Sequence, residues 1–166
     1  MSAVEARLAE LGLELPEAFP AQGTYVSVRV DGDIAYVSGH GPMLGGRPMY
    51  QGKLGADLTV EEGQRSAELT MLNILASLKA ELGDLDRVTG FLKLLILVNA
   101  DPAFDLPHLV ANGASDLVVA LYGPGAVHAR SAIGAATLPF RIATEIEAIV
   151  KVEPSVKVES SVKVNP

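Results

Sequence analysis

One arginine stands at the start of a segment that otherwise consists of small and apolar residues. The segment "ARSAIGAATLP", residues 129–139, is typical of a β-strand, in which successive side chains point to opposite faces. Arg130, Ala132, Gly134 and Ala136 then share one face, so a long cation heads a face with little side-chain bulk. A guanidinium in such a place is suited to bidentate binding of a carboxylate. A salt bridge at the surface or at an interface is the alternative role.

Two carboxylates follow in the next apolar segment, "ATEIEAIV", residues 143–150. Glu145 and Glu147 are two positions apart and share one strand face, where each charge opposes ionisation of the other. An acid in such a place can position a water molecule or carry a proton. Both glutamates could instead lie at an exposed or ion-paired edge of the sheet. Together with Arg130, they indicate a site that holds a carboxylate beside an acid able to use water.

Most other catalytic patterns are missing from the sequence. It has no G-x-S-x-G, Walker, H-E-x-x-H or dinucleotide-binding motif, and it has no cysteine. His40, His108 and His128 lack the i, i+4 spacing of zinc ligands, so we predict no metal site. The glycine-rich segment at residues 39–48 lacks the Lys-Ser/Thr of a phosphate-binding loop, and we interpret it as a turn between strands.

The composition is that of an acidic globular domain. Of 166 residues, 49% are hydrophobic and 20% are charged, and the formal net charge is −7. This charge, without a cluster of Lys and Arg, argues against nucleic-acid and anionic-membrane partners. No apolar run approaches the length of a membrane span, and the N-terminus has a charged helical pattern rather than that of a signal peptide. The absence of cysteine fits a reducing compartment, so we expect a cytoplasmic protein.

The elements that position these side chains follow from apolar spacing and turn residues. Thr59 followed by Glu62 is a capping box at the start of the longest helix, and Asp31-Gly32 is a hairpin signal. The predicted order is helix 3–12, strands on either side of the turn within 24–39, helix 57–83, strand 87–100, helix 106–123, strand 129–139 and strand 143–152. One sheet with two substantial helices packed on one face is the simplest architecture for this order.

The predicted strand at residues 87–100 is apolar on both faces, which indicates an interior strand. Leu94 and Ile96 lie on one face, and Leu95 and Leu97 on the other. With helices on one side only, the second apolar face needs a partner. We therefore expect a homo-oligomer in which bare sheet faces meet.

The end of the chain repeats with a period of six from Val150, as "VKVEPS-VKVESS-VKVNP". We assign residues 1–153 to the folded domain and residues 154–166 to a repetitive tail. The tail is expected to be loosely ordered, and the alternative is an added edge strand that pairs with the same or a neighbouring chain.

Several short segments resemble the RidA (YjgF) family. The most specific are "HARS" and "EIEAIV", and they are supported by "GTYV", "YVSG", "GDLDRV", "ANGASD" and the position of Asn73 on the long helix. The resemblance runs from about Tyr25 to Val150. It implies an α+β chorismate-mutase-like fold, with one sheet covered on one face by two helices. It further implies a homotrimer with a central barrel, with sites in the clefts between subunits.

The resemblance also assigns residues. Arg130 matches the arginine that binds the substrate carboxylate, and Glu145 matches the acid associated with the catalytic water. The remaining substrate-binding positions are Tyr25, Gly39, His40, Asn112 and Ala132, the last acting through its backbone. The chain departs from the family where "GTY" replaces the usual "GPY", His40 replaces Gln and Ala132 replaces a frequent Cys. These departures resemble a divergent branch whose substrate side chain differs.

The best-defined activity of the family is hydrolysis of reactive enamines and imines to ketones and ammonia. For this chain the resemblance predicts an enzyme that deaminates a small carboxylate-bearing enamine or imine, with Arg130 holding the carboxylate and Glu145 orienting water. No metal or organic cofactor is expected, because an iminium carbon is already electrophilic and mainly needs placement. The alternative is a binding module that senses a keto acid or amino acid without turnover. The endoribonuclease activity often attached to the family is disfavoured by the acidic charge and by the lack of a base–nucleophile set.

Overall fold

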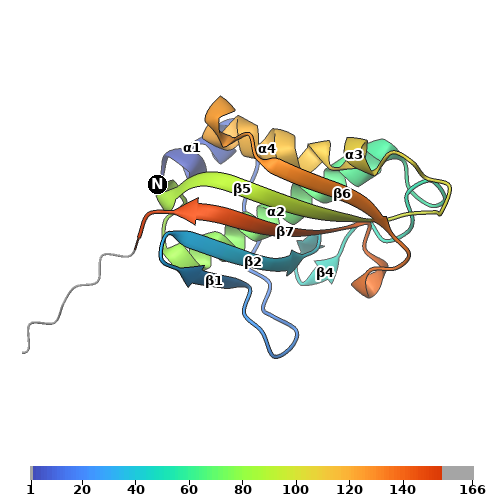
Figure 1. The fold of residues 1–166 in the computed structure, drawn as a ribbon, viewed down its shortest axis with the longest axis horizontal. Coiled ribbons are helices and arrows are strands. Elements are labelled where there is room, and N and C mark those ends of the chain that lie inside the picture. The colour runs from blue at the N-terminus through green and yellow to red at the C-terminus, as the bar shows by residue number, and fades with distance from the viewer. Residues whose placement is uncertain (1, 155–166) are drawn as a thin grey trace, which may run out of the picture.

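A computed structural model describes residues 2–154 of the chain (Figure 1). The predicted tail at residues 154–166 therefore lies, apart from Pro154, outside the described residues. The described chain forms an α+β fold with a mixed sheet, as the order of the predicted elements requires.

The main sheet has five strands in the order β1-β2-β7-β5-β6. Its strands are β1 (Val28–Asp31), β2 (Ile34–His40), β5 (Val88–Asn99), β6 (Ala129–Ala135) and β7 (Thr144–Val152). All neighbours are antiparallel except β5 and β6, which run parallel. The prediction that the doubly apolar strand is interior is confirmed, because β5 lies between β7 and β6. Strand β6 is an edge strand, and this places Arg130 at the border of the sheet.

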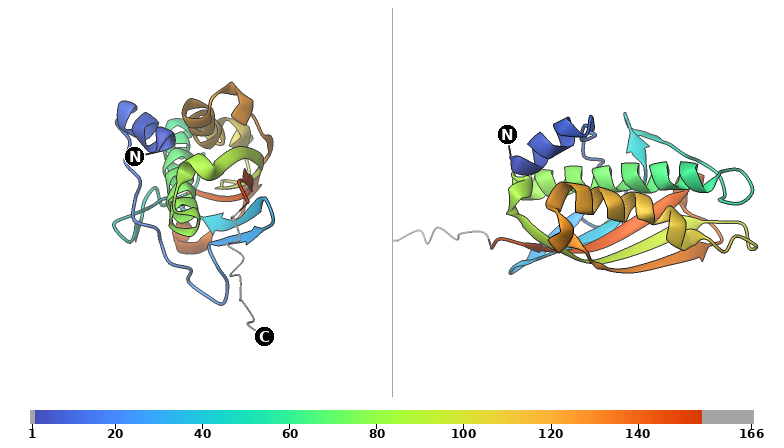
Figure 2. Two further views of the ribbon diagram at one scale, coloured as in Figure 1. Left: turned by 90° about the vertical axis from the view of Figure 1, so that its left-hand side faces the viewer. Right: turned by 90° about the horizontal axis from the view of Figure 1, so that it is seen from above.

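The α-helices of the described chain lie on one side of the sheet, and its other face carries no α-helix (Figure 2). They are α1 (Ala3–Glu10), α2 (Val60–Leu82), α3 (Pro107–Val110) and α4 (Asn112–Tyr122). The predicted capping box of the long helix is confirmed at Thr59 and Glu62. The single helix predicted at residues 106–123 is divided into α3 and α4 at Ala111, whose backbone stays in the helical region.

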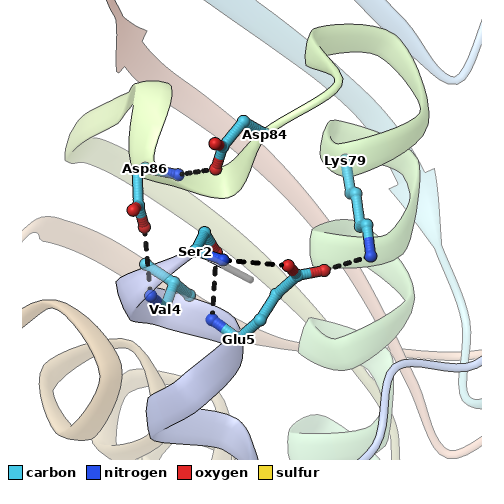
Figure 3. Close-up of polar contacts among 6 residues, drawn as sticks. All are labelled: Ser2, Val4, Glu5, Lys79, Asp84 and Asp86. Carbon is cyan, nitrogen blue, oxygen red and sulfur yellow. Dashed lines mark hydrogen bonds and ion pairs between the residues drawn. The ribbon is translucent and has the colours of Figure 1, made fainter.

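Helix α1 is fastened to the turn before β5 by its N-terminus (Figure 3). Ser2 and Glu5 form a capping box, and the Asp86 carboxylate accepts hydrogen bonds from the backbone N–H groups of Ala3 and Val4 at 2.8 and 3.0 Å. The same Glu5 pairs with Lys79 on α2. This docking fixes where the chain leaves α1 and runs toward β1. The helix was predicted to reach residue 12 but ends at Glu10.

The two faces of the sheet differ in burial. Side chains under the helices are buried, among them Leu94, Ile96, Val98, Ile146, Ala148 and Val150. The opposite face carries half-buried Leu95 and Leu97 on β5, exposed Tyr36 on β2 and exposed Ile133 on β6. The helix-free face therefore exposes apolar side chains, as the sequence predicted, beside the charged side chains of Lys93, Glu145 and Glu147.

One local prediction was wrong. The first strand was expected from residue 24 but begins at Val28, and the chain before it is irregular. The glycine-rich segment, interpreted as a turn between strands, forms a small hairpin of β3 (Met43–Leu44) and β4 (Arg47–Pro48). Its two turn residues, Gly45 and Gly46, have φ of 56° and 73°, which glycine adopts easily and which suits a tight hairpin turn.

Candidate functional site

The structure divides the predicted site residues into two groups. One group lines a cavity and contains Tyr25, Gly39, His40 and Glu145. The other lies at the edge strand β6 and the adjoining helix and contains Asn112, Arg130 and Ala132.

The cavity has a volume of about 260 Å³ and lies between β7, β2 and two irregular segments. The chain before β1 supplies the first segment, residues 19–25, and the turn before β7 supplies the second, residues 139–142. Its walls are mostly apolar. Glu145 is the only acidic side chain among the described residues that line it.

The Glu145 carboxylate lies directly against the backbone of Gly39. A Cβ atom at residue 39 would overlap Oε1 of Glu145, so glycine at this position makes room for the carboxylate. Glu145 is half-buried and makes no hydrogen bond or ion pair within residues 2–154. Burial raises the pKa of its carboxyl group, and the negative charge of Glu147 raises this pKa further. A carboxyl group with a raised pKa and no fixed partner can exchange a proton with a ligand.

His40 is buried at the wall of the cavity, and its tautomer follows from its hydrogen bonds. The carbonyl of Ser38 can only accept, so Nδ1 of His40 carries the proton and donates to it at 2.6 Å. Nε2 then accepts from the hydroxyl of Ser77 on α2 at 2.8 Å. Burial lowers the pKa of His40, although the bond to Ser38 works in the opposite direction. His40 is thus held neutral, as a rigid part of the wall.

Asn73 of α2 adds an unpaired acceptor to the cavity lining. Its Nδ2 donates to the carbonyls of Met43 and Leu69 at 2.9 and 2.8 Å, which fixes the orientation of the amide. Its Oδ1 has no hydrogen-bond partner among the described residues, although the side chain is 1% exposed. A buried acceptor without a partner is unfavourable, and an N–H or O–H donor in the cavity would satisfy it.

Arg130 is oriented by three hydrogen bonds. Its Nη1 donates to Oδ1 of Asn112 and to Oγ of Ser115, both at 3.0 Å, and its Nη2 donates to the carbonyl of His108 at 3.0 Å. A guanidinium has five N–H donors, so the one on Nε and one on Nη2 have no partner within the described chain. The cation is fixed in place and still has two donors for an anion.

A second hydrogen bond of Ser115, to His128, helps to fix the position of Arg130. The Nδ1 of His128 faces the carbonyl of Ala126 at 3.1 Å and must donate to it, and in this tautomer Nε2 is the acceptor. The hydroxyl of Ser115 lies 3.0 Å from this Nε2. Ser115 thus accepts from Arg130 and donates to His128, and the three side chains form one chain of hydrogen bonds.

Arg130 and Glu145 lie on opposite faces of the sheet. Arg130 pairs with Leu94 of β5, whose side chain is buried under the helices. Glu145 pairs with Leu97, three residues further along β5 and therefore on the helix-free face. One molecule of a small acid cannot contact both side chains of the same chain in this arrangement.

Several lining residues were not predicted from the sequence. Phe19 and Phe140 carried no signal, because neither belongs to a periodic segment. Ser115 and His128 lie beside Arg130 and not at the cavity, and they were not predicted either. His128 had a signal, because it lies two positions before Arg130, which puts both on one face if the strand extends to them.

The described residues contain no group of three or more His, Cys, Asp or Glu side chains that could hold a metal ion. Within the same residues, no helix combines the length and the apolar character that crossing a membrane requires.

A five-stranded mixed sheet with helices on one face, an arginine on its edge strand and an acid on its central strand, is the arrangement of a chorismate-mutase-like α+β protein. The family model described as "YjgF/chorismate mutase-like, putative endoribonuclease" matches residues 5–149, and the chain belongs to this family.

Relatives support the assignment along most of the chain. Protein TCP17 of Trypanosoma cruzi is 43% identical over 150 residues, which are 90% of this chain and 94% of that protein. The structure of Atu1372 from Agrobacterium tumefaciens, a protein of unknown function, is 43% identical with a TM-score of 0.85 and covers 91% of this chain and 93% of that one. A Shewanella oneidensis structure, described as a "putative endoribonuclease", is 32% identical with a TM-score of 0.87 and covers 91% of this chain and 100% of that one.

Proposed function

We propose that the protein hydrolyses a 2-imino acid, or its enamine tautomer, to a 2-oxo acid and ammonia. The reaction adds water across the C=N bond and then breaks the C–N bond, so the imine nitrogen leaves as ammonia and the water oxygen becomes the ketone oxygen. No redox change occurs. The iminium carbon is electrophilic before it binds, so the protein needs to position it and to move protons.

The observation that carries the proposal is the state of Arg130. Three hydrogen bonds hold its guanidinium, yet two of its donors have no partner among the described residues. A fixed guanidinium loses little conformational entropy on binding, and two donors match the two oxygens of a carboxylate. Strand β6 is at the sheet edge, where backbone N–H and C=O groups near Ala132 are available for the rest of the substrate.

Glu145 supplies the proton transfers. As a carboxylate it accepts a proton from water while the oxygen attacks the iminium carbon, and it then returns a proton to the departing nitrogen. Burial and the charge of Glu147 raise its pKa, and this makes the carboxylate a stronger base toward water than an ordinary glutamate. The glutamate ends the cycle in its starting state.

The site is proposed to form between copies of the chain. Arg130 and Glu145 face opposite sides of one sheet, so a substrate that contacts both must lie between two subunits. The helix-free apolar face is suited to pack against its equivalents. We propose the homotrimer with a central barrel that the family resemblance implies. A cytoplasmic location is part of the same proposal.

Ammonia release from freshly generated 2-imino acids tests the activity, and sedimentation tests the assembly, which should have about three times the 17.4 kDa of one chain. A mixing experiment tests the shared site. Co-expressed Arg130→Ala and Glu145→Gln chains should regain activity that each variant lacks alone, because about a quarter of the interfaces then combine an intact Arg130 with an intact Glu145. No recovery in verified mixed trimers would contradict a site shared between subunits.

Two results would favour a different function over imine hydrolysis. Affinity for 2-oxo acids without ammonia release would indicate a sensor. Salt-dependent RNA affinity with cleavage would indicate a ribonuclease, which the net charge of −7 disfavours.

A further inference from the structure

The cavity beside Glu145 is larger and more apolar than hydrolysis itself requires. In the proposed reaction the attacked carbon and the water need only the space beside the Glu145 carboxylate, because a general base must lie within hydrogen-bonding distance of the water. The remaining wall has a distinct composition: three aromatic side chains, Phe19, Tyr25 and Phe140, line one space of about 260 Å³. Its apolar and aromatic lining residues are Phe19, Pro20, Tyr25, Met43, Pro139, Phe140 and Ile142.

One wall is built on a strained backbone. Phe140 and Arg141 are consecutive non-glycine residues with φ of 55° and 57°, a conformation that is unfavourable for side chains with a Cβ. Two hydrogen bonds from residues 51 and 52 hold this backbone in place. Nε2 of Gln51 donates to the carbonyl of Phe140 at 2.7 Å, and the N–H of Gly52 donates to the carbonyl of Arg141 at 2.8 Å.

The strain does not serve the core. Phe140 remains 55% exposed after these bonds are made, and it lines the cavity. Backbone strain that holds an aromatic side chain at the mouth of a site is typical of a position that contacts a ligand.

The facing wall comes from the segment between α1 and β1. Leu13 and Leu15 pack against the core, and Phe19 and Tyr25 lie further along the same segment at the cavity. The hydroxyl of Tyr25 accepts a hydrogen bond from the N–H of Gln22 at 3.3 Å, and this bond joins two residues of the same segment. Two independent stretches of chain thus bring aromatic rings to one space beside the proposed reacting group.

We infer that this cavity binds the side chain of the substrate, and that this side chain is bulky and apolar, aromatic or branched aliphatic. The inference rests on the proposed function. The imine carbon carries the carboxylate, which extends toward Arg130, and one other carbon substituent, which extends from Glu145 into the cavity. A methyl group would leave these walls in contact with several water molecules, whereas a benzyl or isobutyl group displaces them.

Calorimetric titration with three 2-oxo acids tests the inference without depending on turnover. Pyruvate, 4-methyl-2-oxopentanoate and phenylpyruvate share the carboxylate and the ketone of the product and differ only in the side chain. We expect the two larger acids to bind at least tenfold more tightly than pyruvate. Equal affinity for all three would overturn the inference.

Phe140→Gly tests the wall, because glycine adopts a φ of 55° without strain and the fold is preserved. The ratio of the affinity for phenylpyruvate to that for pyruvate should fall about tenfold. Phe19→Ala should lower the same ratio from the opposite wall. Phe104→Ala removes a phenylalanine that packs beside Gly55, outside the cavity, and should leave the ratio unchanged. A ratio that Phe140→Gly does not change would also overturn the inference.

Ammonia release from the matching imino acids separates this inference from the proposed function. Release from small imino acids, with no preference for large oxo acids, would overturn the side-chain pocket and keep the activity. Tighter binding of the larger oxo acids, with no ammonia released from any imino acid, would overturn the proposed hydrolysis. The pocket would then belong to a ligand-sensing site.

Discussion

The two groups of site residues are held in place by different means. Arg130 is fixed by directional hydrogen bonds to Asn112, Ser115 and the carbonyl of His108, so its orientation is set by polar partners from another element. Glu145 has no such partner within the described chain and is positioned by close packing against Gly39. The first arrangement suits recognition of a fixed anion, and the second leaves a carboxylate free to exchange protons.

The difference has an energetic counterpart. The hydrogen bonds of Arg130 contribute to stability, since they join β6 to α3 and α4. The residues at the cavity lower the stability of the fold. They include the half-buried carboxylate of Glu145, an unpaired buried amide oxygen on Asn73 and strained backbone at Phe140. Unfavourable features gathered at one place indicate that function, rather than stability, determines the local structure.

The largest effect is expected from Glu145→Gln. The variant keeps the shape of the side chain and removes its proton transfer, so ammonia release should fall by roughly 10²- to 10⁴-fold. Calorimetric affinity for a 2-oxo acid should change little, because the carboxylate of that ligand binds at Arg130. A similar loss of affinity and turnover would mean that Glu145 holds the ligand instead.

Glu147→Gln is the matched control. Removing this charge should lower the raised pKa of Glu145 and move the acidic limb of the pH–rate profile to lower pH. Most of the turnover should remain. Gly39→Ala should mimic the loss of Glu145 without changing any charge, because its Cβ would displace the carboxylate.

Arg130→Lys tests whether Arg130 binds the carboxylate of the ligand. Lysine keeps the positive charge and loses the planar fork, so affinity for a 2-oxo acid should fall about ten- to a hundredfold, the equivalent of one charge-assisted hydrogen bond of roughly 1.5–3 kcal/mol. Arg65→Lys on the exposed face of α2 is the control for charge-preserving change. Unchanged affinity in Arg130→Lys calorimetry would show that Arg130 has only a structural role.

Much of the fold could be predicted because the signals are local. The capping box at Thr59, the turn at Asp31-Gly32 and the double apolar pattern around Leu94 each depend on residues close in sequence. The start of β1 was mispredicted, because residues 24–27 have strand-forming composition but lie beside the cavity and outside the sheet ladder. Composition does not show which segments find a neighbouring strand.

The faces on which the candidate residues lie could be predicted in part, but their arrangement in space could not. Strand alternation placed Glu145 and Glu147 on one face, and the structure has both on the helix-free side. That Arg130 faces the opposite side depends on the register between β5 and β6, which the sequence does not specify. The positive φ of Phe140 depends on hydrogen bonds from residues 51 and 52, nearly ninety positions away.

A smaller effect is expected from Ser115→Ala. The substitution removes one acceptor of Arg130 and its link to His128, so the guanidinium loses part of its orientation. A neutral hydrogen bond contributes about 0.5–1.5 kcal/mol, so KM should rise roughly two- to tenfold while kcat stays close to that of the wild type. Ser115→Thr retains the hydroxyl and should restore KM. A fall in kcat alone, or no rescue by threonine, would contradict a positioning role.

The smallest effect concerns stability and separates the two groups by its sign. The pKa of Glu145 is raised above its ordinary 4.5 in the folded protein, mainly by burial, so the folded state binds this proton more tightly than the unfolded chain does. The resulting stabilisation is fully present below pH 4.5 and is lost as the pH rises through the folded pKa. Above that pKa the wild type holds a charge that burial disfavours, and Glu145→Gln does not. The variant should melt a few degrees higher at pH 7, as expected for about 1 kcal/mol or less, and this difference should shrink toward pH 4.

Arg130→Ala should instead melt lower than the wild type at pH 7, since it loses three hydrogen bonds. Calorimetric melting of both variants at pH 4 and pH 7 measures this contrast, and a destabilised Glu145→Gln at pH 7 would mean that the carboxylate makes a favourable contact and that the cavity is not a strained site.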